Sequence, residues 1–371
     1  MAWSKSLARF TRKLLSKDNV NERTTTIDRN AASLERNARA TLRKTLIVCG
    51  ALAVVLILIS IVAATMGSER LPVADLLRAL FTGGTNTGAL TATQRAILFD
   101  IRLPRILLAA TVGASLAASG ASYQALLRNA LAEPYLLGIS NGAAVGTMVA
   151  LVFLGANEWT RPLMAFGGAL AATFVVYRLA RGRAGATPEK LILAGVIVTT
   201  FQSSAIVFIT TLMDATRIRS FTFWLLGDLS QATPRSIWIA VVSTVVGVVA
   251  LTLKARPLNL MMLGERDAFD LGVEVERVRL QVFLAASLLV GVSVALGGSV
   301  GYVGLVVPHL VRMSTSGDNR LTIPAAALAG ASFVIVADTL ARTVIAPREL
   351  PVGAITALIG APLFIYLLKR R

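Results

Sequence analysis

The side chains able to do chemistry are few in this chain, which has one cysteine, Cys49, and one histidine, His309. A single cysteine cannot form an intrachain disulfide, and a single histidine argues against a multi-histidine metal site and against Ser-His-Asp hydrolysis. The sequence contains no G-x-x-x-x-G-K-[ST] phosphate loop and no paired carboxylates beside an activated nucleophile. We therefore expect no catalytic residue, no bound cofactor and no metal site. If ATP drives this protein, another polypeptide binds it.

The remaining candidates are charged side chains close to apolar segments. Asp338 is the acid nearest the interior of such a segment, where a carboxylate is a functional candidate. Arg342 follows four residues later, so we expect an ion pair on one helix face. Arg102 and Arg105 open another apolar run, and from the residues alone they either anchor a helix end or contact a partner. We expect His309 to be a packed or capping side chain rather than a proton relay.

The elements that must position these side chains are membrane helices. The chain has 371 residues, of which 55% are hydrophobic and 15% charged, too apolar a composition for a soluble globular protein. Residues 45–66 form an uncharged run that would extend roughly 33 Å as a helix, enough to cross the hydrocarbon core. Similar runs recur, and helices satisfy their own backbone in lipid. We therefore predict an all-α polytopic membrane protein.

The apolar pattern predicts about ten transmembrane helices and a short helix near 72–80. The start of the fifth span is marked by Thr187 as a cap, Pro188 at the first position and Glu189 in the first turn. The ten spans are expected near 45–66, 103–124, 137–154, 161–179, 188–212, 236–253, 278–296, 304–314, 322–341 and 351–368.

Small residues recur at spacings that suit close helix packing. Gly138, Gly142 and Gly146 repeat every four residues, which places them on one helix face. The segments VGASLAASG (112–120) and VGVSVALGG (290–298) share five of nine residues. An internal duplication, as in many transporter folds, explains this similarity, and so does independent selection for small-residue packing.

The net charge of +17 is explained by membrane topology better than by nucleic-acid binding. Residues 1–43 are polar and basic, and we expect a partly disordered cytoplasmic tail followed by a signal-anchor helix. Contact with anionic lipid and a passive linker are both open roles for this tail. With ten spans both termini are cytoplasmic, which puts most Lys and Arg inside. Residues 44–371 then form the transmembrane domain.

Residues 254–277 are the longest charged interruption after residue 100. Within it, the stretch 264–272 ends in the helix-stopping glycine Gly272. Five apolar side chains would be costly to expose on a free loop: Met261, Met262, Leu263, Phe269 and Leu271. The segment is either a short helix docked on a partner or a solvated amphipathic loop.

Long motifs, in order, resemble one family. The stretch RLPR…VGASLAASG…Q…RNALAEPYLLGISNGAAVG (102–146) looks like the signature of FecCD-type permeases, the membrane subunits of bacterial ABC importers for ferric siderophores, haem and cobalamin. LILAGV (191–196), LNLMMLGERDAFDLGVEVERVR (258–279), VGYVGLVVPHLVR (300–312) and the C-terminal 35 residues (337–371) match as well. The resemblance covers roughly residues 45–371 and implies a bundle like that of the cobalamin permease.

The resemblance also implies partners and site residues. A second permease subunit, two ATPase subunits and a periplasmic or lipid-anchored solute-binding protein are expected. Arg102, Arg105 and Arg342 match arginines that meet acidic residues of the binding protein. Segment 254–277 matches the coupling segment that contacts the ATPase, through Leu263, Gly264, Glu265, Arg266, Asp270, Leu271 and Gly272. The fifth and tenth spans are expected to line the path, with Gly195, Thr199, Gln202, Ser203 and Thr356 as candidates.

The family's commonest cargo is a ferric siderophore, which is the substrate we expect. Cobalamin and haem are alternatives within the family. A stand-alone ion-coupled transporter would need several intramembrane acids or bases, and this chain offers little beyond Asp338. We expect a bacterial cytoplasmic-membrane protein that contacts membrane lipid and no nucleic acid.

Overall fold

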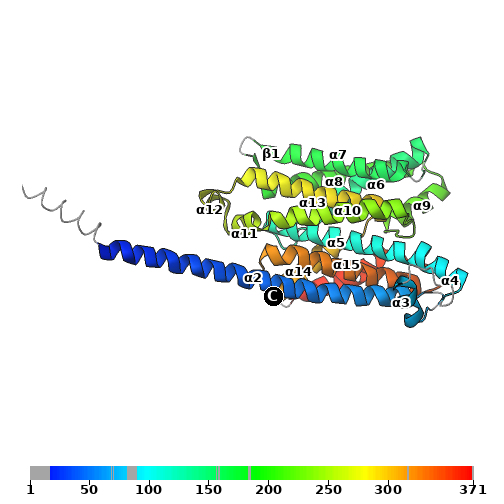
Figure 1. The fold of residues 1–371 in the computed structure, drawn as a ribbon. Coiled ribbons are helices and arrows are strands. Elements are labelled where there is room, and N and C mark those ends of the chain that lie inside the picture. Colours follow the sequence, from blue (N-terminus) through cyan, green and yellow to red (C-terminus); the bar gives the residue numbers. More distant parts are fainter. Residues whose placement is uncertain are drawn as a thin grey trace, which may run out of the picture. The chain divides into compact units, whose positions relative to one another are not determined.

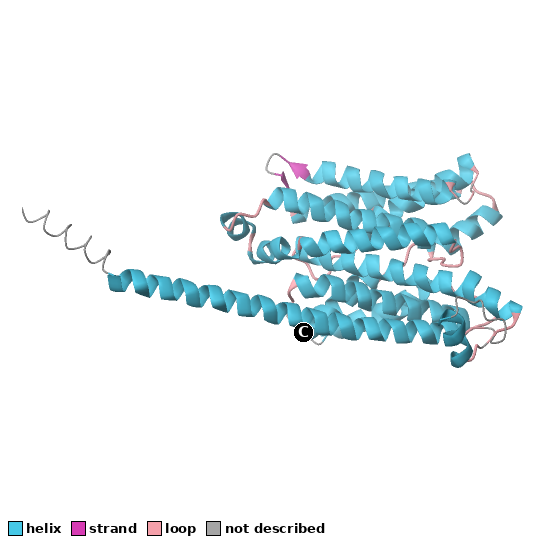
Figure 2. Cartoon of the chain, viewed as in Figure 1, coloured by secondary structure: helices cyan, strands magenta, loops and turns pink. Residues whose placement is uncertain are grey.

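The computed structural model describes residues 17–67, 69, 71–81, 90–155, 157, 159–182, 185–315 and 317–369. The chain divides into two units, residues 1–48 and 49–371, and helix α2 (Lys17–Thr65) runs through the boundary. Residues 1–16 of the expected tail lie outside the described residues, and residues 17–43 are helical. The unit 49–371 is a bundle of helices (Figures 1 and 2).

The unit is almost entirely helical, as the sequence predicts. Its first part contains the end of α2, α3 (Val73–Phe81), α4 (Ala92–Ala96), the π-helix η1 (Ile97–Arg102), α5 (Leu103–Leu126), the 3-10 helix η2 (Pro134–Leu137), α6 (Ile139–Val149), the π-helix η3 (Ala150–Leu154) and α7 (Thr160–Ala180). Two short strands, β1 (Arg181–Gly182) and β2 (Gly185–Ala186), pair antiparallel. The second part contains α8 (Pro188–Thr210), α9 (Ala215–Leu225), α10 (Pro234–Leu253), α11 (Ala255–Leu263), α12 (Glu265–Asp270), α13 (Val275–Gly297), α14 (Val303–Ser314), α15 (Asn319–Thr343) and α16 (Val352–Lys369).

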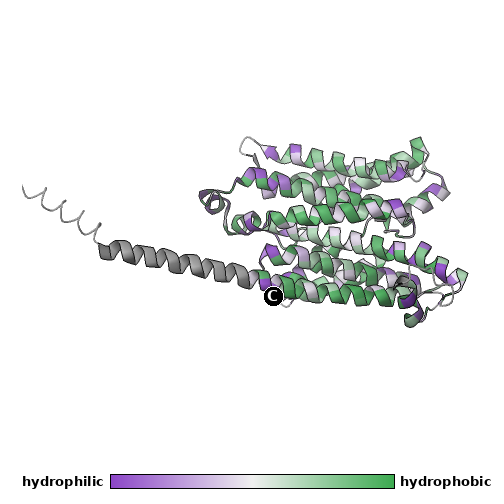
Figure 3. Cartoon of the chain, viewed as in Figure 1, coloured by the Kyte–Doolittle hydropathy of each residue, from purple (hydrophilic) through white to green (hydrophobic). Residues whose placement is uncertain are grey.

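The ten predicted spans correspond to α2, α5, α6 with η3, α7, α8, α10, α13, α14, α15 and α16. Six helices in the described residues have the length and hydropathy of a membrane span: the segment Thr41–Thr65 of α2, and α7, α8, α10, α13 and α15. Three more are shorter apolar helices, Ile139–Leu154, Val303–Ser314 and Val352–Leu367. Apolar residues dominate the middle of the helices and polar residues gather at their ends (Figure 3).

Helix α5 lies at the centre of the unit, packed against α10, α13, α14 and α15. It is buried over most of its length because small residues let its neighbours approach. A Cβ on Gly120 would overlap the backbone of Gly304 in α14, and one on Gly113 would overlap the backbone of Gly330 in α15. These two contacts require glycine.

Two features differ from the sequence predictions. Residues 213–235, which lie between two predicted spans, contain helix α9, which Asp214 caps by accepting a hydrogen bond from Arg217 N at 3.0 Å. The residues of this helix mix polar and apolar types, so no continuous apolar run marks it in the sequence. The second span is preceded by α4 and η1, which add eleven helical residues before Leu103. By contrast, the predicted start of α8 is confirmed, since Thr187 Oγ1 accepts from Lys190 N at 3.4 Å.

Candidate functional site

The segment between α10 and α13 is anchored on one side and exposes apolar side chains on the other. Leu258 and Met261 of α11 are buried. Leu263, Phe269 and Leu271 have exposed fractions of 74%, 71% and 64%. Burying such side chains would release water from apolar surface, so this face is suited to protein contact. In Figure 1 the segment lies at the end of the helices opposite α9.

One buried arginine fixes α12 to the rest of the unit. Arg279 in the first turns of α13 is only 3% exposed. Its Nη2 lies 2.6 Å from Glu265 Oε1, and its Nη1 lies 3.2 Å from Glu276 Oε2 and donates to the carbonyl oxygen of Ala186. Arg128, after α5, reaches the same Glu265 oxygen at 3.3 Å. Glu265 is therefore held between α13 and the loop that follows α5.

A second set of polar contacts fixes α11. Asn259 Oδ1 accepts from Asn319 N at 2.9 Å and from Asn319 Nδ2 at 2.8 Å. Asn259 Nδ2 donates to Asp318 Oδ1 at 2.6 Å, and Asp318 caps α15. The position of α11 is thus tied to the start of α15.

Of the residues expected to meet the ATPase, the structure gathers all seven on α11, α12 and the turn that follows. Arg266, Asp270, Leu271 and Gly272 are exposed, whereas Glu265 is partly buried by its arginine partners. Gly272 has a positive φ of 84° and ends the segment, as the sequence predicts. Sequence reasoning missed Arg279, which lies on the next helix, and Arg128, which is 137 residues from Glu265, because neither spacing places the pair on one helix face.

The opposite end of the unit contains the three predicted docking arginines, of which Arg102 and Arg105 are buried and Arg342 is partly buried. Arg105 Nε lies 2.9 Å from Asp338 Oδ1, and Arg105 Nη1 lies 2.8 Å from Glu349 Oε2. Arg342 Nε lies 3.1 Å from Asp338 Oδ2, which confirms the predicted ion pair four residues apart. Arg102 donates to the carbonyl oxygens of Ala64 (2.9 Å) and Glu69. Each guanidinium group therefore has partners within the chain.

Four of the five candidate path residues lie together where α8 contacts α6 and η2. Asn141 Nδ2 donates to Ser203 Oγ at 2.9 Å, and Gly195 packs against the backbone of Leu136. Thr199 Oγ1 and Gln202 Oε1 are buried with no hydrogen-bond partner among the described residues. The fifth candidate, Thr356 in α16, is fully buried and donates to Gly353 O at 3.0 Å.

The three glycines of the four-residue repeat have different surroundings. Gly142 and Gly146 face α7, where added Cβ atoms would overlap the backbones of Gly168 and Met164. Gly138 precedes α6 in the left-handed conformation (φ 74°) and faces α8 instead. His309 is 5% exposed and its ring contacts Phe364.

The model of the FecCD transport family matches residues 52–370. The chain belongs to the FecCD transport family. Among its FecCD relatives, the hemin transport system permease protein HmuU of Yersinia pestis is 39% identical, covering 80% of this chain and 93% of HmuU. The cobalamin import system permease protein BtuC of Halobacterium salinarum is 41% identical, covering 75% of each chain. A solved inward-facing structure of a putative metal-chelate type ABC transporter is similar with a TM-score of 0.77 and 28% identity, covering 87% of this chain and 99% of that one.

FecCD membership decides the class of the protein. It is a multi-pass membrane permease of the ABC importer type, a subunit that is not itself an enzyme. The all-helical prediction and the family resemblance are both confirmed. The roles assigned to individual arginines, coupling residues and path residues remain proposals.

Proposed function

We propose that this permease carries a metal chelate across the bacterial cytoplasmic membrane, with a ferric siderophore as the first candidate cargo. The observation that carries the transport proposal is the anchored α11–α12 segment with its exposed Leu263, Phe269 and Leu271. This surface suits a separate ATPase subunit, which would supply the ATP-driven motion that the chain has no phosphate loop to generate. The relatives are named as hemin and cobalamin permeases, which supports a metal-chelate cargo. Hemin and cobalamin are therefore the two alternatives to a ferric siderophore.

The complete importer, on this proposal, contains two permease subunits, two ATPase subunits and a solute-binding protein. The two permeases are copies or paralogues, and both chain termini are cytoplasmic. Segment 254–277 then lies in the cytoplasm, and the Arg105–Asp338–Arg342 cluster lies at the outer face.

The test is uptake of radiolabelled metal in cells that lack this gene. The panel contains several ferric siderophores, haem and cobalamin, and each strain is complemented with the wild-type gene, Phe269→Asp or Phe269→Leu. We expect uptake of one chelate to be lost on deletion, restored by wild type and Phe269→Leu, and lost again with Phe269→Asp. Loss of haem or cobalamin uptake alone would replace the siderophore proposal. Uptake that survives ATP depletion but not loss of the proton gradient would contradict the ABC mechanism.

We also propose that Arg102, Arg105 and Arg342 contribute to docking of the binding protein. Because Arg105 is paired with Glu349, whose side chain is 50% exposed, a carboxylate of the binding protein would join or replace Glu349 there. Glu349→Gln should raise the affinity of the binding protein and make it more sensitive to salt. Unchanged affinity and salt dependence in Glu349→Gln and in Arg342→Gln would contradict this role.

A further inference from the structure

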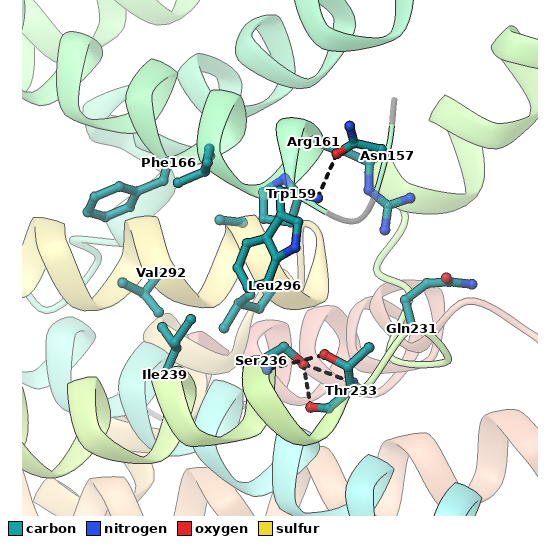
Figure 4. Close-up of a pocket in the computed structure, with 13 residues that line it drawn as sticks. Asn157, Trp159, Arg161, Phe166, Gln231, Thr233, Ser236, Ile239, Val292 and Leu296 are labelled. Atoms are coloured by element: carbon teal, nitrogen blue, oxygen red, sulfur yellow. Dashed lines mark hydrogen bonds between the residues drawn. The ribbon is translucent and has the colours of Figure 1, made fainter. Parts of the chain in front are cut away.

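A cavity of about 610 Å³ opens between the ends of α7, α10 and α13 that lie away from the α11–α12 segment (Figure 4). Residues from the start of α7, the start of α10 and the end of α13 line it. None of them belongs to the coupling segment, the arginine cluster or the α6–α8 contact. The cavity is therefore separate from those three sites, and whatever binds in it is a different molecule or group.

The chemistry of the walls changes with depth along the helices. Thr233 and Ser236 lie in the capping turn of α10, and their hydroxyl groups line the cavity near its polar end. Phe166, Ile239 and Val292 line it further into the spans. Ile239 is six residues beyond Thr233, or about 9 Å along the helix axis. A polar rim followed by an apolar wall at that depth matches the change from headgroup to acyl chain at a bilayer surface.

One arginine lines the rim and a second lies beside it, and both suit a phosphate. Arg161, the second residue of α7, lines the cavity. The guanidinium carbon of Arg235 lies 4.5 Å from the ring centroid of Trp159, which also lines it. In the described part of the chain no carboxylate lies within ion-pair distance of either arginine. Asp228, the acid that interacts electrostatically with Arg161, already accepts hydrogen bonds from Ser230 N and Oγ at 2.8 and 2.6 Å.

We propose that this cavity is a binding site for one anionic phospholipid of the adjacent leaflet. Its phosphate lies at the rim with Arg161 and Arg235, and one acyl chain lies along Phe166, Ile239 and Val292. Arginine suits the phosphate because its planar fork donates two parallel hydrogen bonds. Trp159 suits the boundary because indole rings favour the headgroup level of a membrane. A zwitterionic lipid fills the apolar part of the cavity equally well, but its headgroup has no net charge and is attracted less strongly by the arginines at the rim.

The test uses tryptophan quenching in reconstituted protein. A single-tryptophan protein keeps Trp159, with Trp3, Trp224 and Trp238 changed to Phe. A second one keeps Trp238 instead, which is 69% exposed on α10 and does not line the cavity. Both are reconstituted in phosphatidylcholine with increasing fractions of brominated phosphatidylglycerol or brominated phosphatidylcholine. We expect about fivefold preferential quenching of Trp159 by the anionic lipid, and no preference at Trp238.

Matched variants identify the groups responsible. Arg161→Gln and Arg235→Gln should each reduce the preference, and together they should abolish it. Arg219→Gln is the control, since Arg219 also carries an exposed charge beside an aromatic ring, Phe223, on α9. Ala295→Leu narrows the apolar part without changing charge and should reduce quenching by both lipids at low lipid fractions.

Three results would overturn the proposal. They are equal quenching of Trp159 by the two lipids, a preference that survives the double arginine variant, and the same preference at Trp238. Loss of the preference on addition of soluble inorganic phosphate would show a free-anion site instead. Quenching of Trp159 by a ferric siderophore or haem that competes with the lipid would assign the cavity to the cargo. If Arg161→Gln does not fold, Arg235→Gln and Ala295→Leu still decide the question.

Discussion

Arg279 of α13 and Glu265 of α12 form an ion pair of 2.6 Å that joins the long helix α13 to the short helix α12. Arg279 is almost fully buried, and the side chain of Glu265 is one-third exposed. This pair makes the position of α12 dependent on the position of α13. A force applied to the exposed face of α12 therefore reaches a helix that packs against α5, α7 and α10.

Removing this pair should weaken coupling more than it weakens assembly. Arg279→Gln leaves Glu265 with only Arg128, so we expect ATP-driven chelate uptake to fall about tenfold and the unfolding temperature to fall by a few degrees. Uptake in membrane vesicles and thermal unfolding in detergent measure the two effects. Arg277→Gln is the control, because Arg277 is exposed and its one ion pair among the described residues is with Glu274 at 3.2 Å. Equal effects of the two substitutions would refute a special role for Arg279.

The buried cluster around Asp338 should behave as one unit in stability measurements. Asp338→Asn leaves Arg105 and Arg342 without their shared counter-charge, and we expect a cost of about 3–5 kcal/mol. Adding Arg105→Gln should recover part of it, with a coupling free energy of about 1–3 kcal/mol in a double-mutant cycle. Asp214→Asn, at an exposed pair with Arg217, should cost far less. If the free-energy costs of Asp338→Asn and Arg105→Gln were strictly additive, these residues would not form one energetic unit.

Two glycines near the α6–α7 contact should respond oppositely to alanine. A Cβ at Gly146 would overlap the carbonyl of Met164, so Gly146→Ala should destabilise the protein by about 1–3 kcal/mol. A Cβ at Gly167 on α7 meets open space, so Gly167→Ala should be neutral or stabilising by up to about 1 kcal/mol. Thermal unfolding of the two variants checks the contrast. A stable Gly146→Ala protein would show that the helices separate easily here.

The contact between α11 and α15 should weaken at acidic pH, because it depends on the ionised carboxylate of Asp318. Burial raises the pKa of Asp318, but hydrogen bonds from Arg320 and Asn259 outweigh it and hold the pKa below its usual value. A lowered folded-state pKa stabilises the fold above the unfolded pKa of about 4, and the contribution is lost as pH falls through the folded value. Asp318→Asn should therefore lower the unfolding temperature at neutral pH, and this difference should shrink as pH falls from about 4 through the folded-state pKa. A pH-independent difference would contradict this assignment.

The sequence was enough for features set by local spacing. The ten spans, the Thr187 cap, the stop at Gly272 and the Asp338–Arg342 pair follow from periodicity, turn chemistry or a four-residue interval. Contacts between distant segments could not be predicted this way, because one sequence carries no information on which helices are neighbours. Arg128 with Glu265 and Arg105 with Glu349 are of this kind.

Helix α9 was missed for a different reason. Its residues lack the continuous apolar stretch that marks a membrane span in a sequence. The residues around its N-cap, Asp214, mix polar and apolar types and do not predict a helix. Met261 was expected on the partner-facing surface together with Phe269, but it is buried against the unit. Composition showed that the segment was amphipathic, and only the fold determined which side chains point inward.

The glycine contacts of α5 determine which parts of the permease can move separately. Gly120 touches the backbone of α14 and Gly113 the backbone of α15, so neither neighbour can slide along α5 without a steric clash. This close backbone contact favours movement of these three helices as one body during transport. By contrast, α8 has only five buried residues, Pro188, Leu191, Ala194, Gly195 and Val198, all in its first half. On the proposal that α8 lines the path, its far half is the part of that lining that can move while the central body keeps its shape.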